Sequence, residues 1–306
     1  MRRIILIGVI VVLIGVLIYM FSNTDSSVNN NADDGKLVAL STFTIINDMV
    51  KEIGGDKVEA ISLTKPGAEI HGYETTPGDL VKASRADVFF ENGMNLELWA
   101  DKLRSSLPDM PSYVVSEGVE VLEIREGSYE GKPNPHAWMS PQQGMIYIEN
   151  IRMALVEIDP QNAEYYNNNA ANYTEKLAEV NTKLSEALST LPENNRVLVT
   201  CEGAFTYLAN DYNLKEVYLW AINDESGGSP QDVARVIDTV RENDIPAVFC
   251  ESTVEPKIQQ EVVDATDAVL GGRLYVDSLS LEDGPAPTYL KLLEGTADII
   301  INGLTR

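Results

Sequence analysis

The stretch DPQNAEYYNNNAANYTEKLAEVNTKLSEALSTLPENN, residues 159–195, lies in the middle of the chain and decides how the chain is organised. Its apolar side chains recur at helical spacing, at Tyr166, Tyr173, Leu177, Val180, Leu184 and Leu188. No glycine occurs in it, and no proline interrupts it between its two ends. We therefore predict one connecting helix over residues 159–192. About thirty residues at roughly 1.5 Å each give a strut on the order of 45 Å long, stiffer than a hinge made of several strands.

Short β-branched runs alternate with amphipathic stretches on both sides of this helix. Four runs precede it and four follow it: LVALSTF, VEAISLT, DVFF and SYVV, then RVLVT, EVYL, AVFC and RLYV. Strands that alternate with helical stretches indicate βαβ units with parallel sheets. We predict an α/β fold with an N-terminal lobe over residues 37–158 and a C-terminal lobe over residues 193–306. Thr76, Ser140 and Ser229 each stand before a proline, which is typical of a helix start.

The composition narrows the possible partners. The 306 residues carry 23 Lys and Arg against 47 Asp and Glu, a formal net charge of −24. Such a surface repels the phosphates of nucleic acids, so we expect no nucleic-acid partner, and it attracts cations. With 44% apolar residues the chain has enough material for folded cores, which excludes global disorder.

The N-terminal stretch MRRIILIGVIVVLIGVLIYMF, residues 1–21, has the features of a membrane segment. Two arginines precede an apolar run that approaches the thickness of a bilayer core, so we predict a signal peptide or an N-terminal membrane anchor. The arginines favour a cytoplasmic start, which places the rest of the chain outside. No cysteine follows the run, as a lipoprotein would require, and small residues of a cleavage site are missing after Phe21. We favour a retained anchor, followed by a polar linker over residues 22–36.

The two histidines of the chain both lie in loops that lead into predicted helix starts. His71 follows a predicted strand in PGAEIHGYETTPGD, and His136 lies in the proline-flanked loop NPHAWMSP. Ligands of open α/β sheets bind at the carboxyl ends of the strands. Either histidine alone could be a hydrogen-bonded loop residue. Two histidines used in this way predict a shared metal site.

Carboxylates are expected to complete that site, because neutral imidazoles leave the charge of a divalent ion uncompensated. Glu202 follows the strand RVLVT, and Asp277 ends the strand RLYV. With the two histidines they would form a closed and neutral set of four ligands. A helix N-terminal acid at Glu202 and an N-cap at Asp277 are the alternatives. Glu251, after AVFC, lies on the same edge, and we rank it behind the ligands as a supporting residue.

Cys201 and Cys250 have no CxxC spacing, which excludes a zinc ribbon, an iron–sulfur ligand set and a disulfide-dense scaffold. We predict that both are small buried hydrophobic residues. A Cys201 thiolate at the metal would favour zinc. Its direction, opposite to Glu202 along the strand, should instead point it into the core.

Several motifs of this chain resemble the metal-binding solute-binding proteins of ABC importers for manganese and zinc. They are GAEIHGYETTPGDL, ADVFFENGMNLELWADKL, NPHAWMSP, CEGAFTYLANDYNL, SGGSPQDVARVIDTVRENDIPAVFCEST and LYVDSLS, and the similarity runs from about residue 37 to the C-terminus. The resemblance implies two (β/α)4 lobes joined by one long rigid helix, with the metal between the lobes. It implies as metal ligands His71, His136, Glu202 and Asp277. Asn134 replaces the aspartate usual in the family's D-P-H motif, which should tune the loop without abolishing binding.

The resemblance also bears on the choice of metal. The third ligand is commonly histidine in zinc-type members and glutamate in manganese-type members, and Glu202 matches the latter. The stretch REGSYEGKPNPH also lacks the histidine-rich loop that often precedes the second ligand in zinc-type members. Carboxylate oxygens suit Mn(II), although the Irving–Williams order gives zinc the higher affinity at such a site.

We therefore expect a monomeric protein at the outer cell surface, not an enzyme and without a catalytic cofactor. It would capture Mn(II), with Zn(II) or Fe(II) as runners-up, and deliver the ion to an ABC importer permease. The alternatives are an anchored metallohydrolase with Glu251 as general base, and an adhesin.

Overall fold

The computed structural model describes residues 35–127, 129–222 and 228–306. The chain divides into two units, residues 1–36 and 37–306, and the following concerns the second. The predicted membrane segment lies outside the described residues, as does nearly all of the predicted linker, so both stay predictions. In the part of the chain that is described, we find no helix with the length and apolar character needed to cross a bilayer.

The N-terminal lobe is built on one parallel sheet with the strand order β2–β1–β3–β4. The strands are β1 (Leu37–Ser41), β2 (Val58–Ser62), β3 (Val88–Glu91) and β4 (Ser112–Val114). The helices are α2 (Thr44–Gly54), α3 (Pro77–Ala83), α4 (Asp101–Ser105) and α5 (Pro141–Ile158). Each of the four predicted strands is confirmed.

Side chains of this sheet alternate between its two faces, and both faces are covered. Leu40 and Phe89 join a small core with residues of α3 and α4, whereas Ala39 and Phe90 join the main core with α2 and α5. Strands buried on both faces carry apolar residues at nearly every position. This explains why the predicted runs are continuous rather than alternating.

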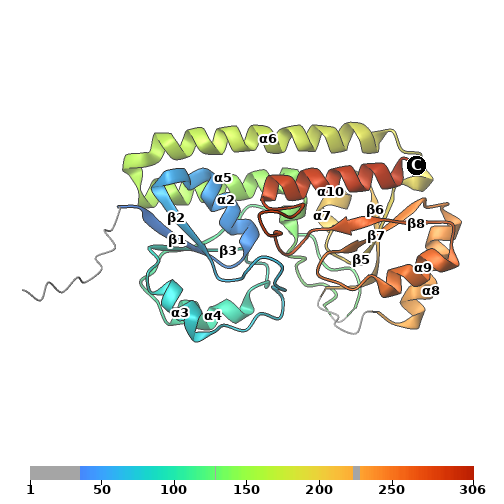
Figure 1. Ribbon diagram of the computed structural model, residues 1–306, viewed down its shortest axis with the longest axis horizontal. Helices are drawn as coiled ribbons and strands as arrows, with labels where there is room; N and C mark the ends of the chain where they lie inside the picture. Colours follow the sequence, from blue (N-terminus) through green and yellow to red (C-terminus); the bar gives the residue numbers. More distant parts are fainter. Residues whose placement is uncertain (1–34, 128, 223–227) are drawn as a thin grey trace, which may run out of the picture. The chain divides into compact units, whose positions relative to one another are not determined.

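The predicted connecting helix is α6 (Ala163–Ser189), preceded by a 3-10 turn (Pro160–Asn162). All six apolar positions that predicted it are buried. Figure 1 shows α6 passing along both lobes beside α5 and α10 (Tyr289–Leu304). The helix is a few residues shorter at each end than predicted, because a proline turn precedes it and a further 3-10 turn (Glu193–Asn195) follows it.

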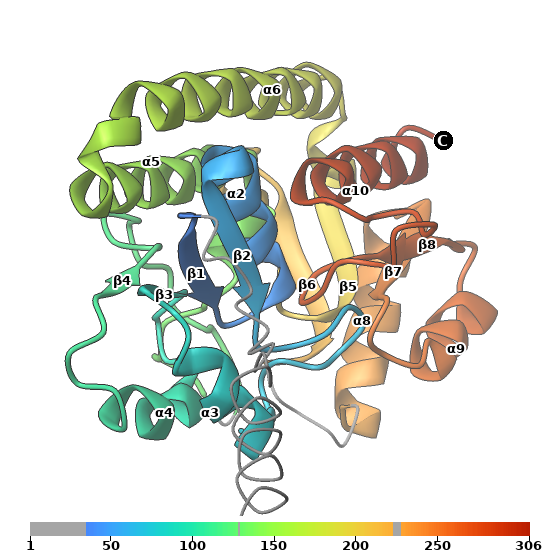
Figure 2. The same cartoon turned by 60° about the vertical axis from the view of Figure 1, so that its left-hand side comes forward.

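The C-terminal lobe contains two pairs of parallel strands, which Figure 2 shows on the side opposite the first sheet. They are β5 (Val197–Glu202) with β6 (Lys215–Trp220), and β7 (Ala247–Glu251) with β8 (Val269–Leu274). The surrounding helices are α7 (Thr206–Asp211), α8 (Pro230–Glu242), α9 (Lys257–Ala265) and α10. The second group of four predicted strands is therefore also confirmed.

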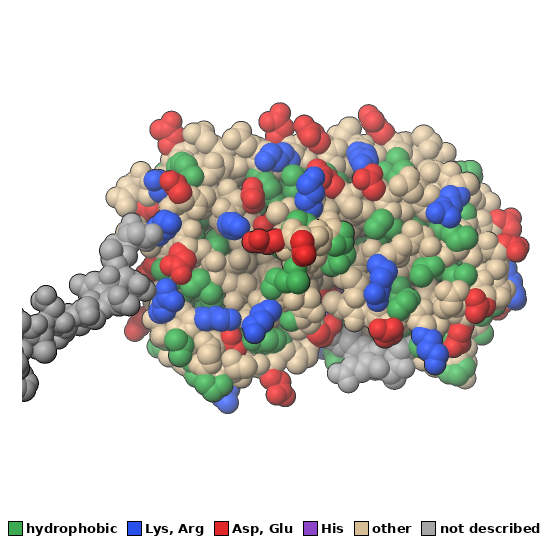
Figure 3. Space-filling model, viewed as in Figure 1, with side chains coloured by type: hydrophobic (Ala, Val, Ile, Leu, Met, Phe, Trp, Pro, Cys, Tyr) green, Lys and Arg blue, Asp and Glu red, His purple; other side chains and the backbone are tan. Residues whose placement is uncertain are grey.

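One hydrophobic core runs through both lobes. It includes residues of β1, α2, α5 and α6 and continues into α7, β7 and α10. On the face shown in Figure 3, acidic and basic side chains are interspersed over both lobes, so the excess of acidic residues forms no single patch there. This face therefore shows no charged patch that would mark a ligand-binding site.

Candidate metal centre

The two histidines meet, although they are 65 residues apart in the chain. Their Nε2 atoms are 3.1 Å apart and their rings tilt across each other at 59°. His71 comes from the loop between β2 and α3, and His136 from the loop before α5. Two neutral imidazoles with converging Nε2 atoms can supply two of the four ligands of a tetrahedral metal site.

Two carboxylates from the C-terminal lobe face this pair. Asp277 Oδ1 lies 3.3 Å from His136 Nε2 and 3.9 Å from His71 Nε2. Glu202 Oε1 lies 3.8 Å from His71 Nε2. The structure thus brings all four sequence-predicted residues together, and the donor atoms of His71, His136 and Asp277 all lie within 4.8 Å of one another.

Their positions differ in detail from the sequence analysis. Glu202, predicted to follow its strand, is the last residue of β5, and Asp277, predicted to end its strand, lies beyond the end of β8. β8 stops at Leu274, and two residues separate it from Asp277. Trp138 Nε1 donates a 2.9 Å hydrogen bond to the carbonyl of Val276, so a tryptophan two residues after His136 holds the backbone beside Asp277.

The site is buried and its charge is unbalanced without a cation. His136 and Asp277 have no exposed surface, and both carboxylate oxygens of Asp277 are buried without a hydrogen-bond partner among the described residues. Burial lowers the pKa of His136 to about 3 and also lowers the pKa of His71. Burial raises the pKa of Asp277, and the charge interaction with nearby His71 offsets part of this rise. Neutral imidazoles and orphaned carboxylate oxygens are the donor set that a divalent ion satisfies.

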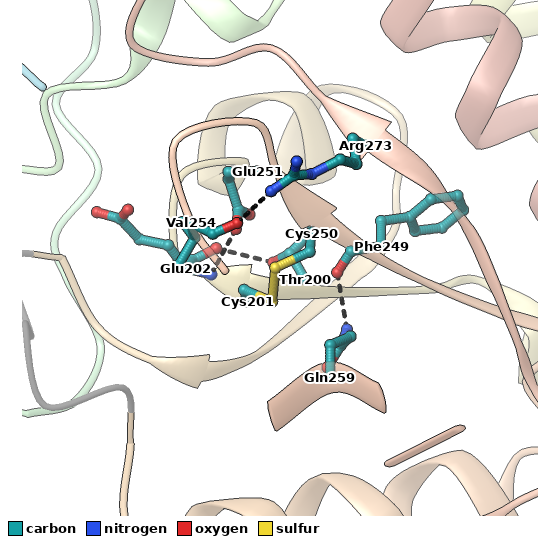
Figure 4. The surroundings of a disulfide bond; sticks show 9 residues. All are labelled: Thr200, Cys201, Glu202, Phe249, Cys250, Glu251, Val254, Gln259 and Arg273. Atoms are coloured by element: carbon teal, nitrogen blue, oxygen red, sulfur yellow. Dashed lines mark hydrogen bonds between the residues drawn. A yellow bond between two sulfur atoms is a disulfide. The ribbon is translucent and has the colours of Figure 1, made fainter. Parts of the chain in front are cut away.

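Cys201 and Cys250 are buried as predicted, but the prediction of two separate hydrophobic residues is wrong. They form a disulfide between β5 and β7, with 4.9 Å between their Cα atoms, as Figure 4 shows. Each cysteine stands directly before a glutamate at the end of its strand. Because both thiols are bonded to each other, neither is a thiolate ligand. The pairing had no local signal, since 49 residues separate the two positions.

Glu251 lies behind Glu202 on the neighbouring strand (Figure 4). Its Oε2 accepts a 3.2 Å hydrogen bond from the backbone N–H of Glu202. Burial raises the pKa of Glu251 to about 8. Its position fits a residue that holds the Glu202 backbone.

The sequence analysis missed the structural part played by the motif ENGMNLEL. Glu97 accepts hydrogen bonds from the backbone N–H groups of Asn92 (2.7 Å) and Gly93 (3.1 Å), and burial raises its pKa to about 7. Asn92 Nδ2 then donates to the carbonyl of Pro135, directly before His136. Through these hydrogen bonds Asn92 and Glu97 stabilise the loop that carries His136. The only sequence signal was the motif itself, because no pattern marks a glutamate as fully buried.

His71 lines a cavity, whereas His136 is fully buried. The cavity measures about 500 Å³ and is mostly apolar, with Tyr73, Trp99 and Tyr129 among its lining residues. Trp99 Nε1 donates a 3.0 Å hydrogen bond to the carbonyl of Ile70 and so fixes the backbone beside the ligand. The two histidines thus differ in their surroundings on the side away from the carboxylates.

The family model described as "Zinc-uptake complex component A periplasmic" matches residues 40–303. The chain belongs to this family. It is 55% identical over 276 residues to the iron-binding protein YfeA of Yersinia pestis, covering 90% of this chain and 89% of that protein. It is 34% identical over 278 residues to the manganese ABC transporter substrate-binding lipoprotein PsaA of Streptococcus anginosus, covering 89% and 90%.

A solved structure with the same fold is the Mn-bound periplasmic metal binding protein of Candidatus Liberibacter asiaticus. It has a TM-score of 0.82 and 39% sequence identity, and the match covers 88% of this chain and all of that one. The two-lobed fold with its connecting helix, which the sequence predicted, is confirmed. The chain is a metal-binding substrate-binding protein of an ABC importer and not an enzyme, so the metallohydrolase alternative is wrong.

Proposed function

We propose that this protein captures one Mn(II) ion outside the cytoplasm and delivers it to the permease of its ABC importer. The observation that carries the proposal is the convergence of two imidazole nitrogens from one lobe and two carboxylates from the other on one buried point. The ligands would be His71, His136, Glu202 and Asp277. The ion is the cargo of this site and takes part in no reaction there.

The donor set supports manganese over the other candidates. Two nitrogens and two carboxylates are harder than the nitrogen- and sulfur-rich sets that favour zinc. The names of the relatives differ, since they mention iron, manganese and zinc. Zinc would still bind more tightly at equilibrium by the Irving–Williams order, so the delivered ion follows availability as well as affinity.

The proposed location is the outer face of a membrane, with residues 1–21 as the anchor and residues 22–36 as the linker. A buried disulfide is typical of proteins that fold in an oxidising compartment. The relatives are named as periplasmic proteins or lipoproteins. We divide the folded part into residues 37–158, 159–192 and 193–306, acting as a monomer.

The test is a metal-content and competition measurement on the full-length protein in detergent. The parent should retain one ion per chain after dialysis, His71→Ala should lose most of it, and Glu202→His should shift competition from Mn(II) toward Zn(II). Glu261→His, an exposed position on α9, is the control for an added histidine and should leave the competition unchanged. A folded parent that retains no transition metal would reject the proposal.

A further inference from the structure

Asn134 connects the two halves of the site. Its Oδ1 accepts a hydrogen bond from the backbone N–H of His136 (3.1 Å) and also lies 2.9 Å from His136 Nδ1. Its Nδ2 donates to the carbonyl of Gly203 (2.8 Å) and to Thr206 Oγ1 (2.9 Å) in the C-terminal lobe. Gly203 directly follows Glu202. One buried side chain therefore joins the backbone next to two of the proposed ligands, one from each lobe.

The partners of Asn134 leave its amide one orientation. The carbonyl of Gly203 can only accept a hydrogen bond, so it must face the amide NH₂. The backbone N–H of His136 can only donate, so it must face the amide oxygen. His136 Nδ1, which faces the same oxygen, then has to carry the ring proton. Its Nε2 is left with a lone pair that points at Asp277 and His71.

The hydroxyl of Thr206, in the C-terminal lobe, requires the same orientation of the Asn134 amide. This hydroxyl donates a 2.6 Å hydrogen bond to Glu216 Oε2, and Glu216 also accepts from the backbone N–H of Phe205. With its proton used in this way, Thr206 can only accept from residue 134. An aspartate at 134 would place a carboxylate oxygen against two acceptors, Gly203 and Thr206. The structure thus explains why this chain has an amide at this position.

We propose that Asn134 is a positioning residue that holds His136 in its Nδ1–H tautomer and ties the His136 loop to the segment behind Glu202, so that release of the ion requires breaking this tie. The part that concerns ion release rests on the proposed function. The part that concerns the tautomer does not, because it can be read in the metal-free protein.

The experiment compares Asn134→Leu and Asn134→Asp with the parent, using the full-length protein. Asn134→Leu removes all four contacts. Asn134→Asp keeps the acceptor for His136 and loses both donors to the C-terminal lobe. Asn150→Asp is the matched control, because Asn150 Nδ2 also donates two hydrogen bonds, in this case to the backbone carbonyls of Val115 and Glu117, away from the site.

The first readout is the ¹⁵N chemical shift of the imidazole nitrogens in the metal-free protein. The chain has two histidines, so His71→Ala assigns the signals. The parent, Asn134→Asp and Asn150→Asp should show the Nδ1–H form at His136, and Asn134→Leu should show a mixture. An unchanged Nδ1–H form in Asn134→Leu would overturn the tautomer role.

The second readout is the rate at which Mn(II) dissociates into excess chelator. Contacts behind metal ligands typically alter affinity by about 10–100-fold, so we expect Asn134→Leu to release the ion faster by about that factor. Asn134→Asp should also release faster. Its added negative charge would by itself slow release, so acceleration reports the lost tie. A rate at or below the parent's in Asn134→Asp, or equal acceleration in Asn150→Asp, would overturn the tie. A parent without metal would reject the proposed function and leave the tautomer readout intact.

Discussion

The two lobes hold their parts of the site by different means. The N-terminal lobe has a continuous four-stranded sheet and presents its histidines from loops, which hydrogen bonds then orient. The C-terminal lobe has two strand pairs, joined by a disulfide, and presents Glu202 from a strand end. Asp277, in contrast, lies in the loop after β8, beside a backbone carbonyl that accepts a hydrogen bond from Trp138 of the N-terminal lobe. The C-terminal lobe therefore supports one carboxylate by a strand and the other by a contact with the opposite lobe.

A second contrast lies within the N-terminal lobe. His136 is fully buried and its Nδ1 faces the Asn134 side chain at hydrogen-bonding distance, whereas His71 borders a cavity. His136 is therefore the fixed half of the pair. His71 is the half of the pair that borders the cavity.

Removing the disulfide should give the largest loss of stability and would show how far the C-terminal lobe depends on it. A closed loop of 49 residues corresponds to about 4 kcal/mol of unfolding free energy in the chain-entropy account. We expect the Cys201→Ala/Cys250→Ala variant to lose roughly this amount in urea unfolding of the metal-free protein. The parent unfolded with a reductant is the control and should lose a similar amount. Unchanged stability would show that the C-terminal lobe needs no covalent tie.

Replacing each histidine by alanine should sharpen the contrast between the fixed and the open side of the site. Structural metal sites provide about 10–16 kcal/mol from about four ligands, so His136→Ala should weaken metal affinity by about 10²–10³-fold. His71→Ala should cost about tenfold less, because water from the adjoining cavity can replace the imidazole. Equilibrium competition with a chelator measures both. Equal losses would contradict the distinction between the two histidines.

Glu251→Gln should change how stability depends on pH in the metal-free protein. The pKa of Glu251 is about 8 in the folded state and near 4.5 when unfolded. Between these values the folded state holds an extra proton, so the parent loses stability as the pH rises, by at most about 1.4 kcal/mol per pH unit. The glutamine variant lacks this group. The unfolding free energy of the variant, measured by urea titration relative to the parent, should therefore increase from pH 5 to pH 8. A constant difference between the two proteins would contradict the raised pKa of Glu251.

The smallest effects should come from a matched pair of helix caps, one in each lobe. Thr76 and Ser229 each hydrogen-bond an aspartate three residues on, at the starts of α3 and α8. Thr76→Ala and Ser229→Ala should each cost about 1 kcal/mol of unfolding free energy. Similar losses would show that the lobes unfold together. A loss from one variant alone would separate them.

The sequence predicted the elements of this protein better than the contacts between them. The buried stripe of α6 was visible because burial on a helix repeats with a fixed period, and the eight strands were visible as short, continuous β-branched and apolar runs. The four candidate ligands could be named because two histidines lie in loops that lead into helices, because two carboxylates follow predicted strands, and because the motifs around them resemble a known family. The disulfide could not, because it depends on β5 and β7 lying side by side. The contacts of Asn134 could not be predicted either, because two of its partners come from the other lobe. The burial of Glu97 could not be predicted, because no pattern in the neighbouring residues indicates it.

The core that runs from β1 through α6 to α10 has a consequence for folding. Two lobes joined only by a linker could melt separately, and each would show its own transition. Here the long helix contributes its buried residues to an interior that both lobes share, beside a smaller core within each lobe. The chain should therefore melt in a single calorimetric transition. Either lobe expressed alone should not fold stably.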